Sequence, residues 1–255
     1  MPAGKPVILI ISGGWHLPEH YAKLTKALEA VGHEVHCPGN PSMTQVRPPT
    51  AGLAQDSENV RLYAEKLADS GRQIVALMHS YGGQVGTNSL HGLGVQDRSE
   101  KGLSGGVSHL VYMCAFALPE GGSMAGLVND MGHEALMPIA FDFAEDMTVL
   151  CRDPKGMLVG AHDDDKELQE YVDSLQRWNG QGMYDAISHS AWREIPVTYI
   201  FTTSDMTIPF DYQKSMVASL EEQGRSVQTY SLETGHCPNL TATASVVDVV
   251  NKVVS

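Results

Sequence analysis

Short, almost wholly apolar runs alternate with amphipathic helical stretches along most of this chain, and that alternation constrains its fold more than any other feature. Residues 7–11 read Val-Ile-Leu-Ile-Ile, an aliphatic run typical of a parallel strand buried on both faces. Further strands are predicted at 34–37, 73–78, 107–113, 197–201 and 226–232, and helices at 18–31, 57–68, 83–90, 210–222 and from 242 onward. Repeated alternation of this kind predicts an α/β fold with a mostly parallel sheet.

The alternation stops between residues 119 and 192. Half of the chain's 12 methionines fall in this stretch: Met124, Met131, Met137, Met147, Met157 and Met183. Methionine adapts to irregular apolar surfaces, so the pattern predicts a mainly helical insertion rather than sheet, which either packs on the core or forms a lid over an apolar pocket. The predicted organisation is a core in two parts, 1–118 and 193–255, with the lid at 119–192.

Composition excludes several classes of protein. The chain has 17 Lys and Arg against 30 Asp and Glu, a formal net charge of −13, and without a basic stripe it is not expected to bind nucleic acid. Its early apolar run is far shorter than the ~20 residues that span a bilayer, and no cleavage site follows it. The four cysteines form no CxxC pair, so neither a zinc ribbon nor a disulfide framework is indicated. We expect a cytoplasmic protein that uses no metal or cofactor and does not bind membranes; the oligomeric state stays open, a homodimer being one option.

Ser80 is the candidate nucleophile. It lies in the segment Met-His-Ser-Tyr-Gly-Gly, residues 78–83, where a predicted strand meets a predicted helix. A serine in such a tight turn has its hydroxyl pushed out of the sheet. The usual pattern is G-x-S-x-G, and here Met78 stands at the first glycine position. An incidental serine in an ordinary strand-turn-helix is the alternative.

Two further residues extend this interpretation. Asp205 follows the predicted strand 197–201, and His236 follows the strand 226–232. The order Ser, Asp, His, each after a strand, is the order of one type of catalytic triad on a parallel sheet. Taken singly, Asp205 could be a helix N-cap and His236 an ordinary loop histidine. Glu120, after the strand 107–113, is the alternative triad acid.

The sequence resembles the α/β-hydrolase superfamily over essentially its whole length. Within it, the chain is similar to the small esterase group of plant methyl-ester esterases, hydroxynitrile lyases and related fungal hydrolases. Five segments carry the resemblance: 10–16 (IISGGWH), 28–33 (LEAVGH), 79–83 (HSYGG), 204–209 (SDMTIP) and 235–236 (GH). Relatives often have His-Gly where this chain has Ser12-Gly13.

The resemblance implies acyl transfer through Ser80, with His236 as base and Asp205 orienting it. It also implies that the oxyanion is bound by backbone N–H groups of Tyr81 and of the Gly13-Gly14 loop, with Gly14 preferred. The substrate pocket is expected to include Trp15, His79, Trp178, Tyr184 and Cys237.

The function predicted is a carboxylic-ester hydrolase, of esterase or lactonase type, acting on a fairly apolar small molecule. A serine nucleophile argues against dehalogenases and epoxide hydrolases, which use a carboxylate on this fold. Hydroxynitrile lyases of the related group carry lysine directly after the catalytic histidine, where this chain has Cys237. A non-hydrolytic lyase or cyclase that reuses the triad, and a small-molecule receptor, stay open as alternatives.

Two other histidine clusters have simpler explanations than a metal site. His16 and His20 have the spacing of a chelating pair on a helix, but no third ligand stands out, and positions at the surface or pocket edge are favoured. His162 precedes three aspartates, which an N-cap and the helix dipole explain.

Overall fold

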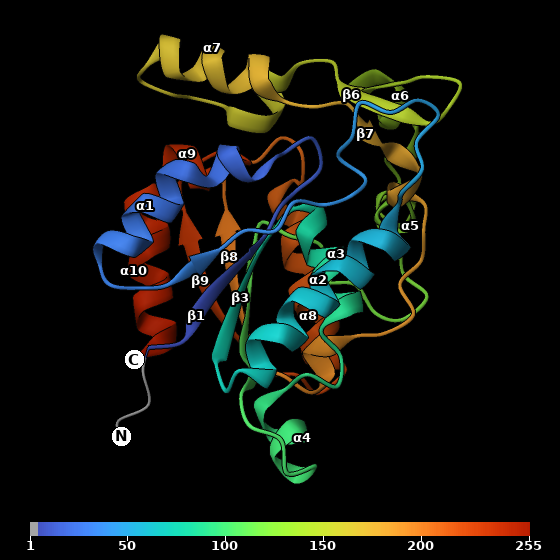
Figure 1. The fold of residues 1–255 in the computed structure, drawn as a ribbon. Helices are drawn as coiled ribbons and strands as arrows, with labels where there is room; N and C mark the ends of the chain where they lie inside the picture. The colour runs from blue at the N-terminus through green and yellow to red at the C-terminus, as the bar shows by residue number, and fades with distance from the viewer. Residues whose placement is uncertain (1–4) are drawn as a thin grey trace.

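The computed structural model describes residues 5–255 and has a six-stranded, wholly parallel sheet at its centre (Figure 1). The strand order is β2-β1-β3-β4-β8-β9. The strands are β1 Val7–Ile11, β2 Val35–His36, β3 Gln73–His79, β4 Gly106–Met113, β8 Val197–Thr202 and β9 Val227–Leu232. Each lies within one residue of its predicted bounds, so the sequence-based prediction of the sheet is confirmed.

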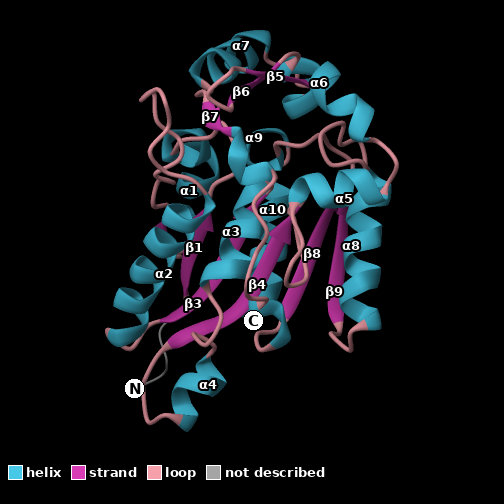
Figure 2. Cartoon of the chain, turned by 90° about the vertical axis from the view of Figure 1, so that its right-hand side faces the viewer, coloured by secondary structure: helices cyan, strands magenta, loops and turns pink. Residues whose placement is uncertain are grey.

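Helices cover both faces of this sheet (Figure 2). One face carries α1 Ala22–Ala30 and α10 Thr243–Val254, and the other carries α2 Leu53–Asp69, α3 Tyr81–Ser89 and α8 Phe210–Glu222. Strand β1 serves both cores, because Ile8 and Ile10 pack on the first side while Leu9 and Ile11 pack on the second. Double coverage is the reason that the strand sequence is apolar throughout rather than alternating.

The strand order places a crossover beside β1. The chain leaves β1 for β2 on one side and reaches β3 on the other. The loops that follow β1 and β3 therefore diverge at the carboxyl edge of the sheet, which is where open α/β sheets bind their ligands. The short helix α4 Val95–Glu100, which the sequence did not predict, lies at the opposite end of the molecule (Figure 1).

The segment between β4 and β8 lies over the carboxyl ends of the strands (Figure 1). It contains the helices α5 Met124–Asp130, α6 Met137–Ala140 and α7 Asp165–Ser174. The expectation of helix rather than sheet needs correction, because β5 Phe141–Phe143, β6 Thr148–Cys151 and β7 Trp178–Asn179 form a small antiparallel sheet in the order β5-β6-β7. Strands of two to four residues are too short to leave a periodic pattern in the sequence.

The remaining elements are short. They are the helical turns η1 Pro18–Tyr21, η2 Glu134–Leu136, η3 Pro154–Val159, η4 Gly180–Met183 and η5 Ala191–Arg193, with helix α9 Pro238–Thr241. Within residues 5–255, none of the helices has both the length and the apolar composition needed to cross a bilayer. The predicted division of the chain into two core parts, 1–118 and 193–255, and a lid, 119–192, stays a prediction. Residues 1–4 lie outside the part of the chain that the structure describes.

Candidate active site

Ser80 lies in a strained turn between β3 and α3. Its backbone has φ 55° and ψ −123°, a region that costs about 1–3 kcal/mol for a residue other than glycine. The Ser80 carbonyl accepts the N–H of Gly83 at 2.9 Å and that of Phe116 at 3.1 Å. The surrounding backbone thus holds the turn in place, and helix α3 begins at the next residue.

The side chains of Ser80, His236 and Asp205 form a buried hydrogen-bonded chain. His236 Nδ1 lies 2.7 Å from Asp205 Oδ2, and His236 Nε2 lies 2.8 Å from Ser80 Oγ. A carboxylate oxygen carries no proton, so Nδ1–H donates to it and leaves the Nε2 lone pair free to accept the serine O–H. The structure brings together the three residues that their order along the chain singled out.

Asp205 accepts several hydrogen bonds besides that of His236. Its Oδ1 accepts the N–H groups of Thr207 and Ile208, each at 2.8 Å, and its Oδ2 accepts the Thr202 hydroxyl at 2.9 Å. Donors on both oxygens stabilise the anion and fix its orientation. The N-cap of the following helix α8 is Pro209, so Asp205 is not that cap.

Glu120, the alternative acid, is engaged elsewhere. Its carboxylate forms a two-pronged ion pair with Arg193 at the surface, with N···O distances of 3.0 and 3.1 Å. Hydrogen bonding to the Arg193 guanidinium lowers the pKa of Glu120. This geometry favours Asp205 as the partner of the histidine.

The loop after β1 brings two glycines, Gly13 and Gly14, close to Ser80. The Gly13 N–H donates to the hydroxyl of Tyr21 at 2.9 Å. It is therefore not available to bind an oxyanion. Gly14 and Tyr81 border the same cavity as Ser80. A Cβ on Gly14 would lie 2.9 Å from Cε3 of Trp178, so only glycine lets the Trp178 ring approach the loop this closely.

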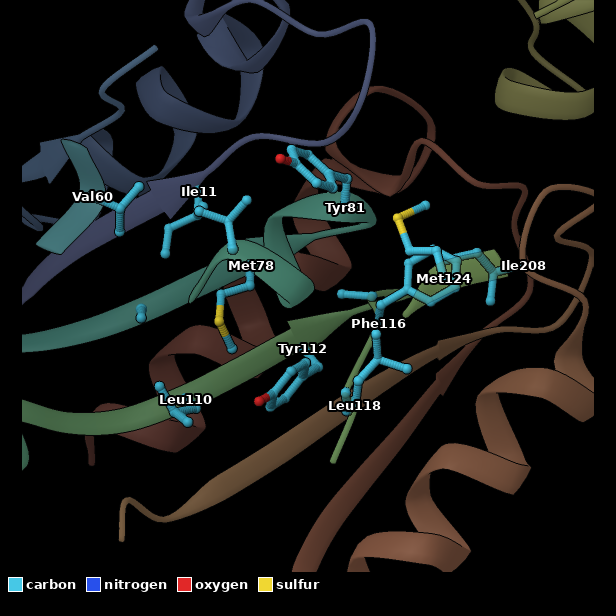
Figure 3. Packing of buried hydrophobic residues seen from close by; sticks show 14 of the residues in the cluster. Ile11, Val60, Met78, Tyr81, Leu110, Tyr112, Phe116, Leu118, Met124 and Ile208 are labelled. Atoms are coloured by element: carbon cyan, nitrogen blue, oxygen red, sulfur yellow. The ribbon is translucent and has the colours of Figure 1, made fainter. Parts of the chain in front are cut away.

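A small apolar cavity of about 30 Å³ adjoins Ser80. It is lined by Gly14, Trp15, Ser80, Tyr81, Phe116, Met124, Val128, Met137, Phe141, Trp178, Met183 and Thr207. Several of these residues belong to the segment between β4 and β8, and three of those are methionines (Figure 3 shows Met124 near Phe116 and Tyr81). Phe116, Val128 and Thr207 were missed by sequence reasoning because nothing local distinguishes them from ordinary core, helix and loop residues.

The five pocket residues expected from the sequence divide into two groups. Trp15 and Trp178 line the cavity and meet edge to face, with ring centroids 5.5 Å apart. The other three lie elsewhere. His79 and Cys237 are buried outside the cavity lining, and Tyr184 is 46% exposed and borders a separate surface hollow. Tyr184 directly follows the turn η4, and the centroid of its ring lies 6.2 Å from that of Phe143.

His16 and His20 are both buried rather than exposed at the surface. His20 also borders a hollow lined by residues of η1 and α7, so only the surface alternative of the expectation needs correction. His16 Nδ1 lies 2.5 Å from the Gly14 carbonyl, and His20 Nδ1 accepts the Leu17 N–H at 2.9 Å. The two rings bond to backbone groups, which explains their burial without a metal. The capping interpretation of the aspartate run is confirmed, since Asp164 accepts two N–H groups at the start of α7.

Within residues 5–255, one group of three potential metal ligands lies close together: His79, Cys114 and His236. Each nitrogen of both imidazoles is within hydrogen-bond distance of a protein group. Their lone pairs are therefore already used, and the cluster does not form a ligand set.

A buried carboxylate, that of Asp56, accepts a hydrogen bond from Tyr81, the residue after Ser80. Asp56 of α2 accepts the Ser42 N–H at 2.8 Å, the Ser42 hydroxyl at 2.5 Å and the Tyr81 hydroxyl at 2.8 Å. Trp178 Nε1–H in turn donates to Ser42 Oγ at 3.1 Å. Burial raises the pKa of Asp56. Beside the cavity, this network joins helix α2, the loop between β2 and α2, and strand β7. No sequence pattern predicted it.

We expect Asp56→Ala to lower the free energy of unfolding by about 3 kcal/mol or more, because each buried donor left without an acceptor costs roughly 1–3 kcal/mol. Urea denaturation followed by circular dichroism measures the loss. Glu58→Ala, on the exposed side of the same helix, is the matched control and is expected to stay within about 0.5 kcal/mol of wild type. Equal losses for the two variants would contradict a structural role for the network.

The parallel sheet, the strand-to-helix turn at Ser80 and the loops at the carboxyl edge together define a protein of the α/β-hydrolase fold. The model of the alpha/beta hydrolase family matches residues 8–249. The chain belongs to this family, and the resemblance recognised in its sequence is confirmed.

Relatives include fungal proteins. The chain is 28% identical over 237 residues to the alpha/beta hydrolase nvfD of Aspergillus novofumigatus, covering 92% of this chain and 91% of that protein. It is 26% identical over 257 residues to the probable hydrolase R7 of a Phoma species, covering 96% and 97%. Its fold is similar to that of polyneuridine aldehyde esterase, with a TM-score of 0.78 at 17% identity over 99% of this chain and 100% of that one.

Proposed function

We propose that this protein is a serine hydrolase that cleaves a carboxylic ester or lactone of a fairly apolar small molecule. The observation that carries the proposal is the buried chain from Ser80 Oγ through His236 to Asp205, with distances of 2.8 and 2.7 Å, beside an apolar cavity. Membership of a hydrolase family supports it, as do the hydrolase names of the two fungal relatives.

In the first half-reaction, Ser80 Oγ attacks the ester carbonyl carbon while His236 Nε2 takes the hydroxyl proton. A new C–O bond forms, and the carbonyl oxygen becomes an oxyanion that the N–H groups of Gly14 and Tyr81 stabilise. The anionic Asp205 stabilises the imidazolium. The ester C–O bond then breaks, the leaving oxygen takes the proton from His236, and the alcohol departs from the acyl-enzyme.

In the second half-reaction, water attacks the acyl carbon and His236 Nε2 takes the water proton. The bond to Ser80 Oγ breaks, the proton returns to that oxygen, and the carboxylic acid is released. With a lactone, the alcohol and acid are two ends of one hydroxy acid. No cofactor is needed for either half-reaction.

The residues that line the cavity predict a preference for uncharged, apolar acyl groups. Among residues that line it, polar side chains are few and charged ones do not occur. Moving a carboxylate from water into such a site costs several kcal/mol. We expect kcat/KM for p-nitrophenyl butyrate to exceed that for the p-nitrophenyl hemiester of succinic acid by about 100-fold or more. The leaving group is identical, so similar values would contradict an apolar acyl site.

The proposed function is tested by labelling with a fluorophosphonate, in which an activated serine oxygen forms a P–O bond and displaces fluoride. Intact mass is expected to show one adduct on wild type and none on Ser80→Ala, with ester or lactone turnover by wild type alone. Labelling without turnover would favour the lyase, cyclase or receptor alternatives. Failure of wild type to label or to turn over any ester would overturn the proposal.

A further inference from the structure

The Gly13-Gly14 loop poses a physical problem for the proposed mechanism. An oxyanion donor contributes only when it is aimed before the reaction begins, yet two consecutive glycines form the most flexible backbone available. Gly14 tolerates no side chain because Trp178 packs against it. Its orientation therefore depends on hydrogen bonds from neighbouring groups.

One chain of hydrogen bonds runs from Gly13 to the backbone of the catalytic histidine. The Gly13 N–H donates to Tyr21 Oη at 2.9 Å, Tyr21 Oη lies 2.7 Å from His79 Nδ1, and His79 Nε2 lies 2.7 Å from the His236 carbonyl oxygen. Burial lowers the pKa of His79 to about 3, so its ring is neutral. A carbonyl only accepts, so Nε2 carries the proton, Nδ1 accepts, and the Tyr21 hydroxyl donates to it.

A second chain runs from Gly14 to the residue after the catalytic histidine. His16 Nδ1 lies 2.5 Å from the Gly14 carbonyl oxygen, and His16 Nε2 lies 3.6 Å from Cys237 Sγ. The carbonyl again requires the proton on Nδ1, so Nε2 accepts the thiol S–H. Burial raises the pKa of Cys237 to about 12 and lowers that of His16, which keeps the thiol protonated and the ring neutral.

The two chains of hydrogen bonds begin on either side of the peptide group that joins Gly13 to Gly14. The carbonyl of Gly13 accepts the His16 N–H at 3.4 Å, and in a trans peptide the N–H of Gly14 points the opposite way. The flanking Gly13 N–H and Gly14 carbonyl are held by Tyr21 and His16. The rings of His16 and His79 also meet edge to face, with centroids 5.3 Å apart.

We infer that Tyr21, His79, His16 and Cys237 are positioning residues that hold the Gly13-Gly14 peptide in fixed geometry relative to His236. One chain ends at His236 and the other at Cys237, the next residue of the same loop. The base and the oxyanion donor are therefore held in place relative to each other. The inference rests on the proposed function, because it gives this peptide the oxyanion role. It explains why His79 and Cys237 are buried outside the cavity: they align catalytic groups and do not contact substrate.

Tyr21→Phe is the direct test, since it keeps the ring and removes only the hydroxyl. Loss of a whole oxyanion donor costs about 10²–10³ in kcat, so a misaligned donor is expected to cost roughly 10-fold to 100-fold in kcat, with KM unchanged within about twofold. The rate constant for fluorophosphonate labelling is expected to fall in parallel. Tyr112→Phe is the matched control, because it also loses a buried hydroxyl, bonded to Thr87 at 2.7 Å in the core, and it should retain the wild-type kcat.

The second chain is tested by a pair of variants at position 237. Cys237→Ala removes the donor to His16 and is expected to lower kcat at unchanged KM, whereas Cys237→Ser supplies a hydroxyl donor and is expected to recover part of the loss. Thermal unfolding of each variant separates a catalytic effect from a loss of folded protein. If Tyr21→Phe does not fold, this pair decides the inference, and a serine variant no better than alanine overturns it.

Three results are distinguishable. A loss of kcat in Tyr21→Phe but not in Tyr112→Phe supports the inference. Equal kcat values in these two variants, or an effect confined to KM, overturn the inference while the wild-type enzyme remains a serine hydrolase. Wild type that neither labels nor hydrolyses esters overturns the proposed function, and the inference with it.

Discussion

Asp205→Asn is expected to lower kcat for ester hydrolysis by about 10⁴-fold, the loss typical of a triad whose histidine is held in the wrong tautomer. In wild type, Asp205 Oδ2 accepts the His236 Nδ1–H at 2.7 Å. The asparagine of this variant would still accept the N–H groups of Thr207 and Ile208 through its amide oxygen, which would place the NH₂ group toward His236. Nδ1 would then accept, Nε2 would carry the proton, and Ser80 would lose its base.

Steady-state kinetics on one ester, with circular dichroism to confirm folding, measure this effect. Glu120→Gln is the matched control, since it makes the same change in the alternative acid, whose partner is Arg193 at the surface. We expect the Glu120→Gln kcat to stay within about twofold of wild type. A large loss in Glu120→Gln, with Asp205→Asn active, would assign the acid role to Glu120.

Gly82→Ala is expected to lower the free energy of unfolding by more than about 3 kcal/mol. A Cβ on Gly82 would collide with the Ile11 carbonyl oxygen and lie 2.8 Å from its carbonyl carbon and 2.9 Å from the Ser12 oxygen. These atoms belong to the backbone of β1 and its loop, so no side chain can rotate to make room. Relief requires that α3 move away from the sheet, which also displaces Ser80.

Differential scanning calorimetry tests this expectation. For a chain of this length, a loss of that size corresponds to a fall in Tm of about 10 °C. Gly39→Ala is the control, because its added Cβ would meet only Pro18 side-chain atoms at 3.6 and 3.7 Å, an ordinary packing distance. We expect Gly39→Ala to change Tm by less than about 2 °C, and equal shifts in the two variants would contradict the steric argument.

The strands and the candidate triad were predictable because their signals are local. A parallel strand covered on both faces is mostly apolar, so β1 is visible as an uninterrupted run, and β3, β4 and β8 are visible as apolar runs with few polar residues. Parallel strands end at one edge, so residues that follow different strands are brought to the same place. This rule placed Ser80, Asp205 and His236 together, although 156 positions separate the serine from the histidine.

The sequence by itself thus determined the α/β class, the parallel sheet, the family, and the three side chains at its carboxyl edge. Only the tertiary structure decided the small sheet between β4 and β8, the cavity wall, the burial of His16 and His20, and the two hydrogen-bonded chains that join Gly13 and Gly14 to the histidine loop. The reason is physical. Periodicity reports how one element meets solvent and core, whereas these features depend on contacts between side chains far apart in sequence, for which no local pattern is required.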